Sequence, residues 1–528
     1  MLIGFDASRA FVDQATGTEN YSLNLLRALA KIDRKNRYRV YFRGSSQFTV
    51  GSSQINKTVN RELITKNFIW PKNFEFKTIY PTRFWTQVGL ALETWKNPID
   101  LLFVPAHTLP ILRRRQIGKF EARNTKFLPA DAMHQALQAG EINSNFQNRN
   151  VQNVLNLGHL NLSIVSDLGF RISDFLSKRT IYVVTIHDLG VEYLPGYHQF
   201  PQRYYLDLAS KYAVGTADAI ITVSRATKKD LIDRYGVDPK KVSVVYEGVD
   251  THFFKPLHAS KVQSVKSKYK IKGDYILYVG TIQPRKNLEM LIKAFSLLVH
   301  SSQFIVHSRS RKKSVNPADA EAMADRRELI TDNLQLIIAG KLGWDYQGIL
   351  DAPKKYGVGT LVKFLGYIDE VDLPALYTGA SVFAFPSLFE GFGLPILEAL
   401  SCGCPVVASD IGPHREILNQ LKDNSEGLRT QQVRKSENQK IRELHSEQLA
   451  IRKSDSLTHR RPEFSDESMR MILLKPKDIN KWSQVLYQSI SQYDLRQSLV
   501  TKRRELASKF SWSEAAQKTI EVFEKTLR

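Results

Sequence analysis

Residues 380–416 read ASVFAFPSLFEGFGLPILEALSCGCPVVASDIGPHRE, and this stretch decides which fold the sequence predicts. The apolar run over residues 381–385 predicts a strand, a short helix is expected from about Leu394, and residues 405–408 predict a second strand. This order is one strand–helix–strand step of a parallel sheet. The sequence therefore predicts an α/β protein.

The start of the predicted helix is the first candidate ligand site. Pro395 suits a first helical turn because the N–H that it lacks has no intrahelical partner there. Gly391 and Gly393 leave the N–H groups and the positive dipole end open to a phosphate. Glu390 and Glu398 flank that site, so a diphosphate with a polyhydroxylated group on each side should fit. A surface loop with two solvated acids is the alternative, and the proline, the glycines and the flanking strands argue against it.

The core PS-x-x-EGFGLP-x-x-EA resembles the signature of the group 1 (GT4-like) family of retaining glycosyltransferases. The resemblance implies the GT-B fold, in which two Rossmann-like, doubly wound parallel-sheet domains face each other across a cleft. It also implies that Glu390 contacts the donor sugar and that Glu398 holds the ribose hydroxyls of the nucleotide. The N–H groups near Gly393 and Leu394 would then face the diphosphate.

A second block, GTIQPRKNL, follows a predicted strand over residues 275–279 and resembles the phosphate-binding block of the same family. It begins at Gly280. Arg285 offers a planar guanidinium fork and Lys286 a point charge, and both bind phosphate oxygens well. Two adjacent basic residues are ordinarily a solvated surface, but this context favours a diphosphate site.

Three further candidates rest on shorter resemblances. His187 ends the predicted strand in VVTIHDL, and the resemblance implies that it contacts the transferred sugar from the first domain. In FLGYI, Gly366 and Tyr367 would lie beside the nucleobase. Gly17 lies in the first predicted loop, before a helix expected from residue 20, although Glu19 stands where the family has a second glycine. Glu247 likewise replaces an asparagine of the family pattern.

A chain of 528 residues is too long for one hydrophobic core. We expect an acceptor-side domain over residues 1–255, a nucleotide-sugar domain over 256–510 and a helix over 511–528 that crosses back to the first domain. Three polar segments interrupt the family pattern and predict surface insertions. They cover about residues 113–177, 300–333 and 419–470.

Composition limits where the protein works. Cys402 and Cys404 are the only cysteines, which argues against a disulfide framework and predicts a reducing compartment and a packing role for both. Neither a signal peptide nor an uncharged apolar run of about 18 residues is evident in the sequence. We therefore expect a cytoplasmic protein, with peripheral binding at the inner face of the cell membrane as an option. The net charge of +22 indicates an anionic partner.

The resemblance implies a hexosyltransferase that uses a nucleotide sugar and retains the anomeric configuration. Mannose from GDP-mannose is the leading donor, and the acceptor would be a glycan or a lipid-linked molecule. The sequence shows no D-x-D pattern at a strand end, so neither a metal nor another cofactor is expected. The alternatives are a nucleotide-sugar epimerase or phosphorylase on the same fold, or a basic nucleic-acid-binding protein. No aromatic-interleaved basic module supports nucleic acid as a partner.

An anionic membrane surface is a further expected partner. The candidate contacts are basic residues of the first domain: Arg34, Lys35, Arg37, Arg39 and Arg113 to Arg115.

Overall fold

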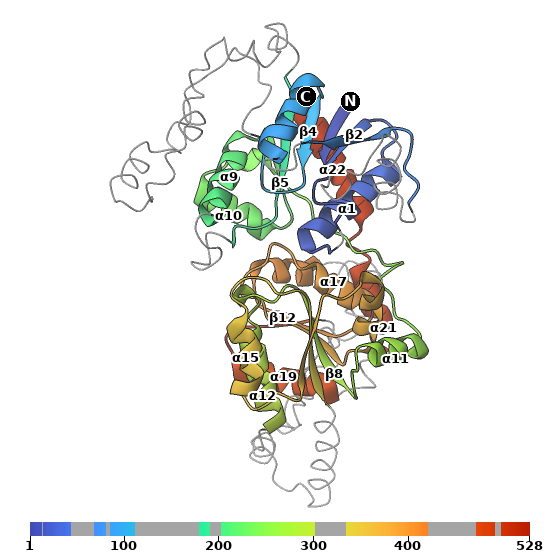
Figure 1. The fold of residues 1–528 in the computed structure, drawn as a ribbon, viewed down its shortest axis with the longest axis vertical. Coiled ribbons are helices and arrows are strands. Elements are labelled where there is room, and N and C mark those ends of the chain that lie inside the picture. The colour runs from blue at the N-terminus through green and yellow to red at the C-terminus, as the bar shows by residue number, and fades with distance from the viewer. Residues whose placement is uncertain are drawn as a thin grey trace, which may run out of the picture.

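The computed structural model describes residues 1–12, 14–43, 68–80, 85–110, 179–190, 202–300, 334–420, 471–491 and 498–528. Two parallel sheets, each flanked by helices, lie one above the other in Figure 1. The predicted insertions fall almost entirely outside the described residues, as do Arg113 to Arg115.

The first sheet has the strand order β3-β2-β1-β4-β5-β6-β7 and is parallel throughout. Its strands are β1 (Leu2–Asp6), β2 (Arg37–Arg43), β3 (Phe74–Ile79), β4 (Leu101–Val104), β5 (Ile181–Ile186), β6 (Ala219–Thr222) and β7 (Val242–Val244). Every residue of β4 and β6 is buried, as expected for central strands covered by helices on both faces.

The second sheet has the order β10-β9-β8-β11-β12-β13. Its strands are β8 (Tyr275–Val279), β9 (Gln335–Ala339), β10 (Val362–Gly366), β11 (Val382–Phe385), β12 (Val406–Ser409) and β13 (Met471–Leu474). The strand order reverses between β8 and β11, and open α/β sheets bind ligands beyond the carboxyl ends of strands at such a point. The loops after β8 and β11 carry the two predicted phosphate-binding blocks.

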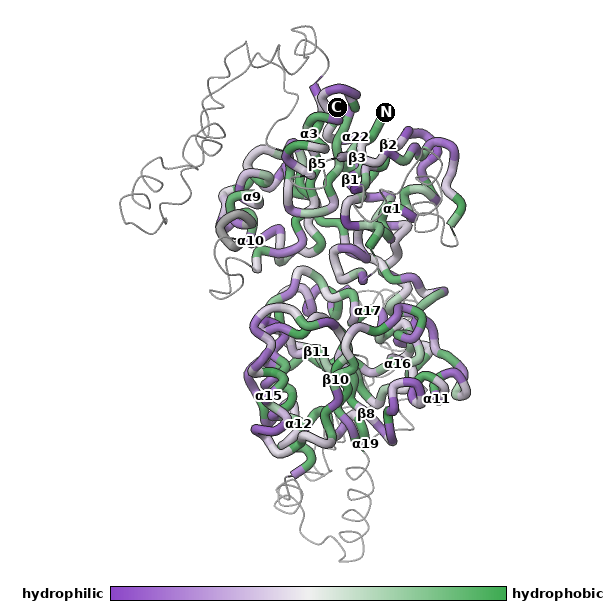
Figure 2. The backbone as a smooth tube through the Cα atoms, in the orientation of Figure 1, coloured by the Kyte–Doolittle hydropathy of each residue, from purple (hydrophilic) through white to green (hydrophobic). Residues whose placement is uncertain are grey.

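Helices cover both sheets, and Figure 2 shows apolar strands inside with polar helix faces outside. The first domain has α1 (Gly17–Ile32), α3 (Ala91–Lys96), α9 (Gln202–Thr216) and α10 (Arg225–Tyr235). The second has α11 (Ala259–Lys268), α12 (Leu288–His300), α15 (Gln347–Lys355), α16 (Leu373–Gly379), α17 (Leu394–Ser401), α19 (Ile479–Ser491) and α21 (Val500–Ala507), and α22 (Trp512–Leu527) ends the chain. Two such domains form the predicted GT-B architecture.

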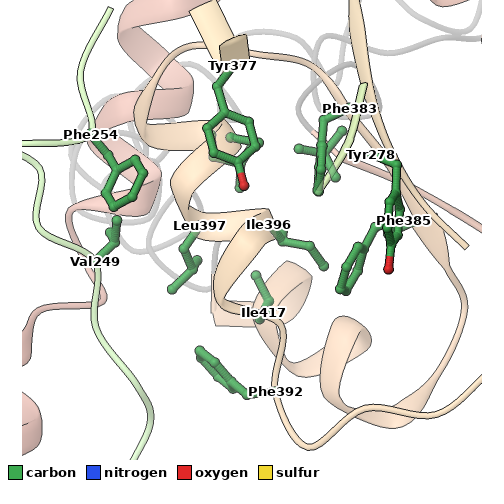
Figure 3. Packing of buried hydrophobic residues seen from close by; sticks show 14 of the residues in the cluster. Val249, Phe254, Tyr278, Tyr377, Phe383, Phe385, Phe392, Ile396, Leu397 and Ile417 are labelled. Atoms are coloured by element: carbon green, nitrogen blue, oxygen red, sulfur yellow. The ribbon is translucent and has the colours of Figure 1, made fainter. Parts of the chain in front are cut away.

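Helix α17 is anchored by its apolar face. Ile396 and Leu397 are fully buried, and Figure 3 shows them among aromatic side chains of the second domain and beside Val249 and Phe254 of the chain that joins the two domains. Cys402, just after the helix, is buried too, as is Cys404. The prediction that both cysteines are packing residues is confirmed. Helix α17 lies at the side of the second domain that faces the first (Figure 1), and Gly391, just before the helix, lies against the main chain of His187 in the first domain.

The chain passes from the first domain to the second between β7 and α11, and back between α21 and α22. These two connecting segments are in contact. The Val249 N–H donates to the Phe510 carbonyl oxygen at 2.9 Å. Beyond this contact α22 returns to the first domain and packs along α1, as predicted (Figure 1). Its N-cap is Ser511, whose hydroxyl accepts the Glu514 N–H at 3.1 Å. Phe523 lies edge-on to Phe103 of β4 with ring centroids 5.2 Å apart.

Replacing Phe523 by alanine should therefore destabilise the first domain although the residue belongs to the last helix. Truncation of a fully buried phenylalanine costs about 3–5 kcal/mol of unfolding free energy. Urea denaturation followed by tryptophan fluorescence measures the loss. Glu521→Ala, an exposed position on the same helix, is the control and should change stability little. Equal stability of both variants would contradict the docking of α22.

Candidate active site

A cleft that is open to solvent lies between the carboxyl ends of the two sheets. Both domains line it, and it gathers all the predicted site residues except one. They are Gly17, His187, Gly280, Arg285, Lys286, Tyr367, Glu390, Gly391, Gly393, Leu394 and Glu398. Gly366 does not line the cleft; it ends β10, and the chain reaches the cleft one residue later, at Tyr367.

A shared carboxylate organises the floor of the cleft. Glu390 accepts hydrogen bonds from Lys286 Nζ through one oxygen and from Arg285 through the other, the latter at 3.2 Å. Arg285 also donates to the Phe389 carbonyl oxygen at 3.0 Å. Glu390 and Lys286 are 8% and 7% exposed, so each charge depends on the other for compensation. The structure thus ties the two predicted phosphate-binding blocks together.

At neutral pH Glu390 is ionised and Lys286 and Arg285 are protonated. Burial raises the pKa of Glu390, but Lys286 and Arg285 together outweigh it and lower that pKa to about 2. Burial, with repulsion from Arg285, lowers the pKa of Lys286 to about 8 despite the opposing attraction of Glu390. Two cations and one anion leave a net positive charge beside the cleft, as a diphosphate site requires.

The N-terminus of α17 is open. Gly393 is its N-cap, and no side chain caps this end of the helix. Leu394 and Pro395 follow, and no acidic residue lies in the first turn. The N-terminal dipole therefore faces the cleft without a competing carboxylate.

Gly391 touches the opposite domain. A Cβ atom at Gly391 would lie 2.2 Å from the main-chain oxygen of His187, so only glycine fits while the domains stand this close. Across the same gap Arg285 lies 3.9 Å from the Asp188 carboxylate. The loop of the second domain that carries Glu390 is thereby set directly against the strand end that carries His187.

His187 is held by its ring and by its backbone. Nε2 donates to the Pro105 carbonyl oxygen at 2.9 Å, because a carbonyl only accepts. Nδ1 then faces Glu247 at 3.5 Å, a contact that is favourable when a proton lies between the ring and the carboxyl group. Burial raises the pKa of Glu247, and the contact with His187 partly offsets that rise. His187 and Glu247 thus lie in contact in the wall of the cleft.

The first helix differs from expectation. Helix α1 begins at Gly17 rather than at residue 20, because Thr16 and Glu19 form a capping box. The Glu19 carboxylate accepts the Thr16 N–H at 3.1 Å and pairs with Arg9 at 3.1 Å. This helix end therefore carries its own anion, unlike the open end of α17.

Glu398 lies one turn into α17 and accepts a hydrogen bond from the Tyr377 hydroxyl at 2.8 Å. Burial, with repulsion from Glu370 and Glu247, raises the pKa of Glu398 to about 7. The tyrosine contact moderates that rise. Glu398 therefore changes its charge near neutrality, in contrast to Glu390.

Three acids of the cleft were not among the predicted site residues: Asp188, Glu247 and Glu370. Asp188 directly follows His187 at a strand end. Glu247 follows β7 by three residues. It stands where the family pattern has an asparagine, and this difference is the one feature of the sequence that could have marked it as a site residue. Glu370 follows Tyr367 by three residues and had no signal of its own.

Comparison with protein families supports the assignment of both domains. Residues 261–453 match the family described as Glycosyl transferases group 1, and residues 164–253 match Glycosyltransferase Family 4. Among curated proteins, the chain is 29% identical over 237 residues to O-antigen chain mannosyltransferase B of Escherichia coli, covering 45% of this chain and 55% of that protein. It is 30% identical over 216 residues to D-inositol 3-phosphate glycosyltransferase of Salinispora tropica, covering 39% of each. The chain thus spans about half or less of the curated relatives that it matches.

Solved structures agree on the fold. HepE of Anabaena, in complex with UDP and glucose, aligns with a TM-score of 0.54 at 17% identity, covering 99% of this chain and 100% of that one. Sucrose-phosphate synthase of Thermosynechococcus elongatus aligns with a TM-score of 0.56 at 15% identity, covering 99% and 98%. With this fold and these two domain matches, the chain belongs to the group 1 glycosyltransferases of the GT-B type.

Proposed function

We propose that this protein transfers a hexose from a nucleotide sugar to a glycan or lipid-linked acceptor, with retention of configuration. The observation that carries the proposal is the cleft floor, where Arg285, Lys286 and the open end of α17 converge opposite His187. Fixed positive charge and helix N–H groups suit a diphosphate leaving group. The family matches do not favour an epimerase, a phosphorylase or a nucleic-acid-binding protein.

In the proposed reaction the bond between the anomeric carbon and the diphosphate oxygen breaks, and negative charge builds on the diphosphate. Arg285 and Lys286 meet that charge without reorganisation, because Glu390 already holds both in place. Electrostatic stabilisation of the leaving group is therefore the main contribution of this floor. The oxygen of the acceptor hydroxyl then bonds to the anomeric carbon on the face that the diphosphate leaves, and the hydroxyl proton passes to the departing diphosphate.

The remaining roles follow the position of each residue. Glu398 would hold the ribose hydroxyls from a position one turn into α17, and Tyr367 would lie against the base. His187 would meet the sugar from the other domain. Glu390 would contact the sugar while it fixes the two cations.

Mannose is the proposed sugar because several curated relatives are named mannosyltransferases, O-antigen chain mannosyltransferase B among them. HepE, with UDP and glucose bound, makes UDP-glucose the main competitor. A panel of GDP-mannose, UDP-glucose and UDP-N-acetylglucosamine, each with and without a lipid-diphosphate-linked oligosaccharide, tests the proposal. Release of nucleoside diphosphate with formation of an extended α-linked product is expected for one donor. Absence of transfer from every donor would overturn it.

Replacing Arg285 and Lys286 by alanine should lower kcat/KM, because both are proposed to stabilise the departing diphosphate. The expected rise in activation free energy is roughly 2–4 kcal/mol. The double variant also leaves Glu390 buried without a counterion. The triple variant with Glu390→Gln removes that penalty and is the folding control. We expect it to melt closer to wild type and to remain inactive. Near-wild-type turnover in the double variant would rule out the diphosphate role.

His187→Ala should impair transfer without weakening nucleotide binding, because the side chain belongs to the domain opposite the diphosphate site. Its backbone contacts persist in the variant. Calorimetric titration with the nucleoside diphosphate and with the nucleotide sugar distinguishes a sugar contact from a structural role of His187. Glu247→Gln is the matched variant, because Glu247 is the residue that His187 contacts. An equal loss of affinity for both ligands would identify a structural histidine instead.

Donor affinity should depend on the charge of Glu398. Ribose hydroxyls donate to the ionised carboxylate, whose pKa in the free protein is about 7, so affinity should fall as pH drops below 7. Between pH 7.5 and 5.5 the Kd of the nucleotide sugar should rise on the order of tenfold. This ligand is suitable because its doubly esterified diphosphate does not titrate in that range. Glu398→Gln should bind the nucleotide sugar weakly at every pH. Tyr377→Phe should move the midpoint of the affinity–pH curve to higher pH, because the Tyr377 hydrogen bond lowers the pKa of Glu398. An unchanged pH profile in Glu398→Gln would refute the ribose role.

We also propose reversible binding to an anionic membrane surface through the first domain. No described helix has the length and apolar character needed to cross a bilayer. Among the described candidates, Arg39 pairs with Glu75 at 3.3 Å and is mostly covered. Arg34, Lys35 and Arg37 are exposed at the turn between α1 and β2. These three are the proposed contacts.

Charge reversal tests the membrane proposal. Arg34→Glu/Lys35→Glu/Arg37→Glu should weaken sedimentation with anionic liposomes, since each basic residue contributes about 1 kcal/mol near such a surface. Wild-type binding should fade as salt rises. Lys475→Glu/Lys477→Glu/Lys481→Glu, exposed on the second domain, makes the same change of net charge and is the control. Equal binding of both triple variants would leave only a general charge effect.

A further inference from the structure

We propose that Glu416 is a positioning residue that closes the cleft by capping a helix of the opposite domain. Its consequence for turnover rests on the proposed function. Glu416 lies in the helical segment 412–420 that follows β12 in the second domain. Its two carboxylate oxygens accept the main-chain N–H groups of Arg225 and Ala226, the first two residues of α10 in the first domain, each at 2.7 Å.

This contact completes the cap of α10. Ser224, the N-cap, accepts the Thr227 N–H at 3.0 Å and accounts for the third N–H of the helix. The first turn of α10 contains no acidic residue of its own. The charge that complements its dipole thus comes from the other domain, through a bidentate contact to main-chain donors that no substitution in α10 other than proline removes.

The capped turn is connected to the sugar-facing strand end. Thr227 donates its hydroxyl to the His187 main-chain oxygen at 3.1 Å. That same oxygen is the atom against which Gly391 packs. When Glu416 holds the start of α10, it therefore holds the backbone of His187 against the loop that carries Glu390.

A second close approach marks the same interface. A Cβ atom at Gly412 would lie 2.8 Å from the Cβ of Ala226, so the segment that carries Glu416 reaches α10 only because residue 412 is glycine. Arg225 is exposed to solvent and Glu416 partly so. A contact between two domains, made by one side chain to a helix end, can break and re-form as ligands enter and leave the cleft.

Removal of the carboxylate should shift the protein toward open forms. Because apparent affinity scales with the fraction of molecules that are closed, Glu416→Ala should lower kcat/KM on the order of tenfold. Glu416→Gln keeps one acceptor oxygen and should fall between wild type and Glu416→Ala. Gly412→Leu is an independent wedge and should open the cleft with Glu416 intact. Asp410→Ala removes a carboxylate that pairs with Arg415 within the second domain and is the matched control.

Pulsed electron spin resonance reads the domain separation directly. The two native cysteines are buried, so spin labels can be attached at Lys35→Cys and Lys355→Cys, exposed positions on the two domains. The full chain is measured free and with nucleoside diphosphate. We expect a longer and broader distance distribution for Glu416→Ala and Gly412→Leu, an intermediate one for Glu416→Gln, and a wild-type one for Asp410→Ala, with melting temperatures close to wild type.

The outcomes separate this inference from the proposed function. Wild-type distances and wild-type kcat/KM in Glu416→Ala would overturn the positioning role while transfer by the wild-type protein stands. Absence of transfer by the wild-type protein would overturn the proposed function, yet the distance measurement would still decide whether Glu416 closes the cleft. A large fall in melting temperature together with unchanged distances would assign Glu416 to stability alone.

Discussion

The site depends on one buried carboxylate shared by two cations. Burial of the charged Lys286 side chain is tolerated because Glu390 compensates the charge. Glu390 in turn stays ionised because Lys286 and Arg285 lower its pKa. The backbone reinforces the same geometry, since the Leu388 N–H donates to the Arg285 carbonyl oxygen at 2.8 Å. Loops that are far apart in the chain thereby act as one rigid block at the point where the strand order reverses.

In the proposed reaction the rigid block acts together with the first domain. The apolar core runs continuously from one domain to the other through Val249, Phe392 and Phe510, which keeps the domains joined at the crossings. Other contacts between the domains are polar: Asp188 to Arg285 inside the cleft, and Glu416 to the start of α10. An interface that combines apolar and polar contacts suits a cleft that must both close over a ligand and release it.

Much of this was predictable because it is local. Apolar runs bounded by glycine and proline placed the strands β8, β11 and β12 within a residue of where they lie, and a long motif identified Glu390 and Glu398. Strands β2 and β3 were not predicted: RYRVYFR and FEFKTI mix charged and apolar residues, as suits the outer strands of the first sheet. Strand β13 is a run of four residues after a long polar segment and has no sequence signal strong enough to mark it.

The site residues that escaped prediction owe their roles to distance in sequence. Glu416 lies about 190 residues from the helix that it caps, and Glu247 lies 60 residues from His187, so no local pattern reveals either pair. Gly17 illustrates the converse. The glycine is in the cleft as predicted, but the neighbouring Glu19 makes that helix end anionic, and only the folded geometry shows it.

The positive net charge of the chain is not concentrated in the cleft. The chain carries +22, yet the cleft is lined by more acids than bases: Asp188, Glu247, Glu370, Glu390 and Glu398 against Arg285, Lys286 and Lys341. Burial raises the pKa of Glu247, Glu370 and Glu398 and so reduces the negative charge that an arriving diphosphate would meet. The proposed diphosphate site would thus depend on the placement of two cations and not on a positive field over the cleft. The described lining of the cleft therefore does not account for the net charge of +22, and the proposed contact with an anionic surface would instead use exposed basic residues such as Arg34, Lys35 and Arg37.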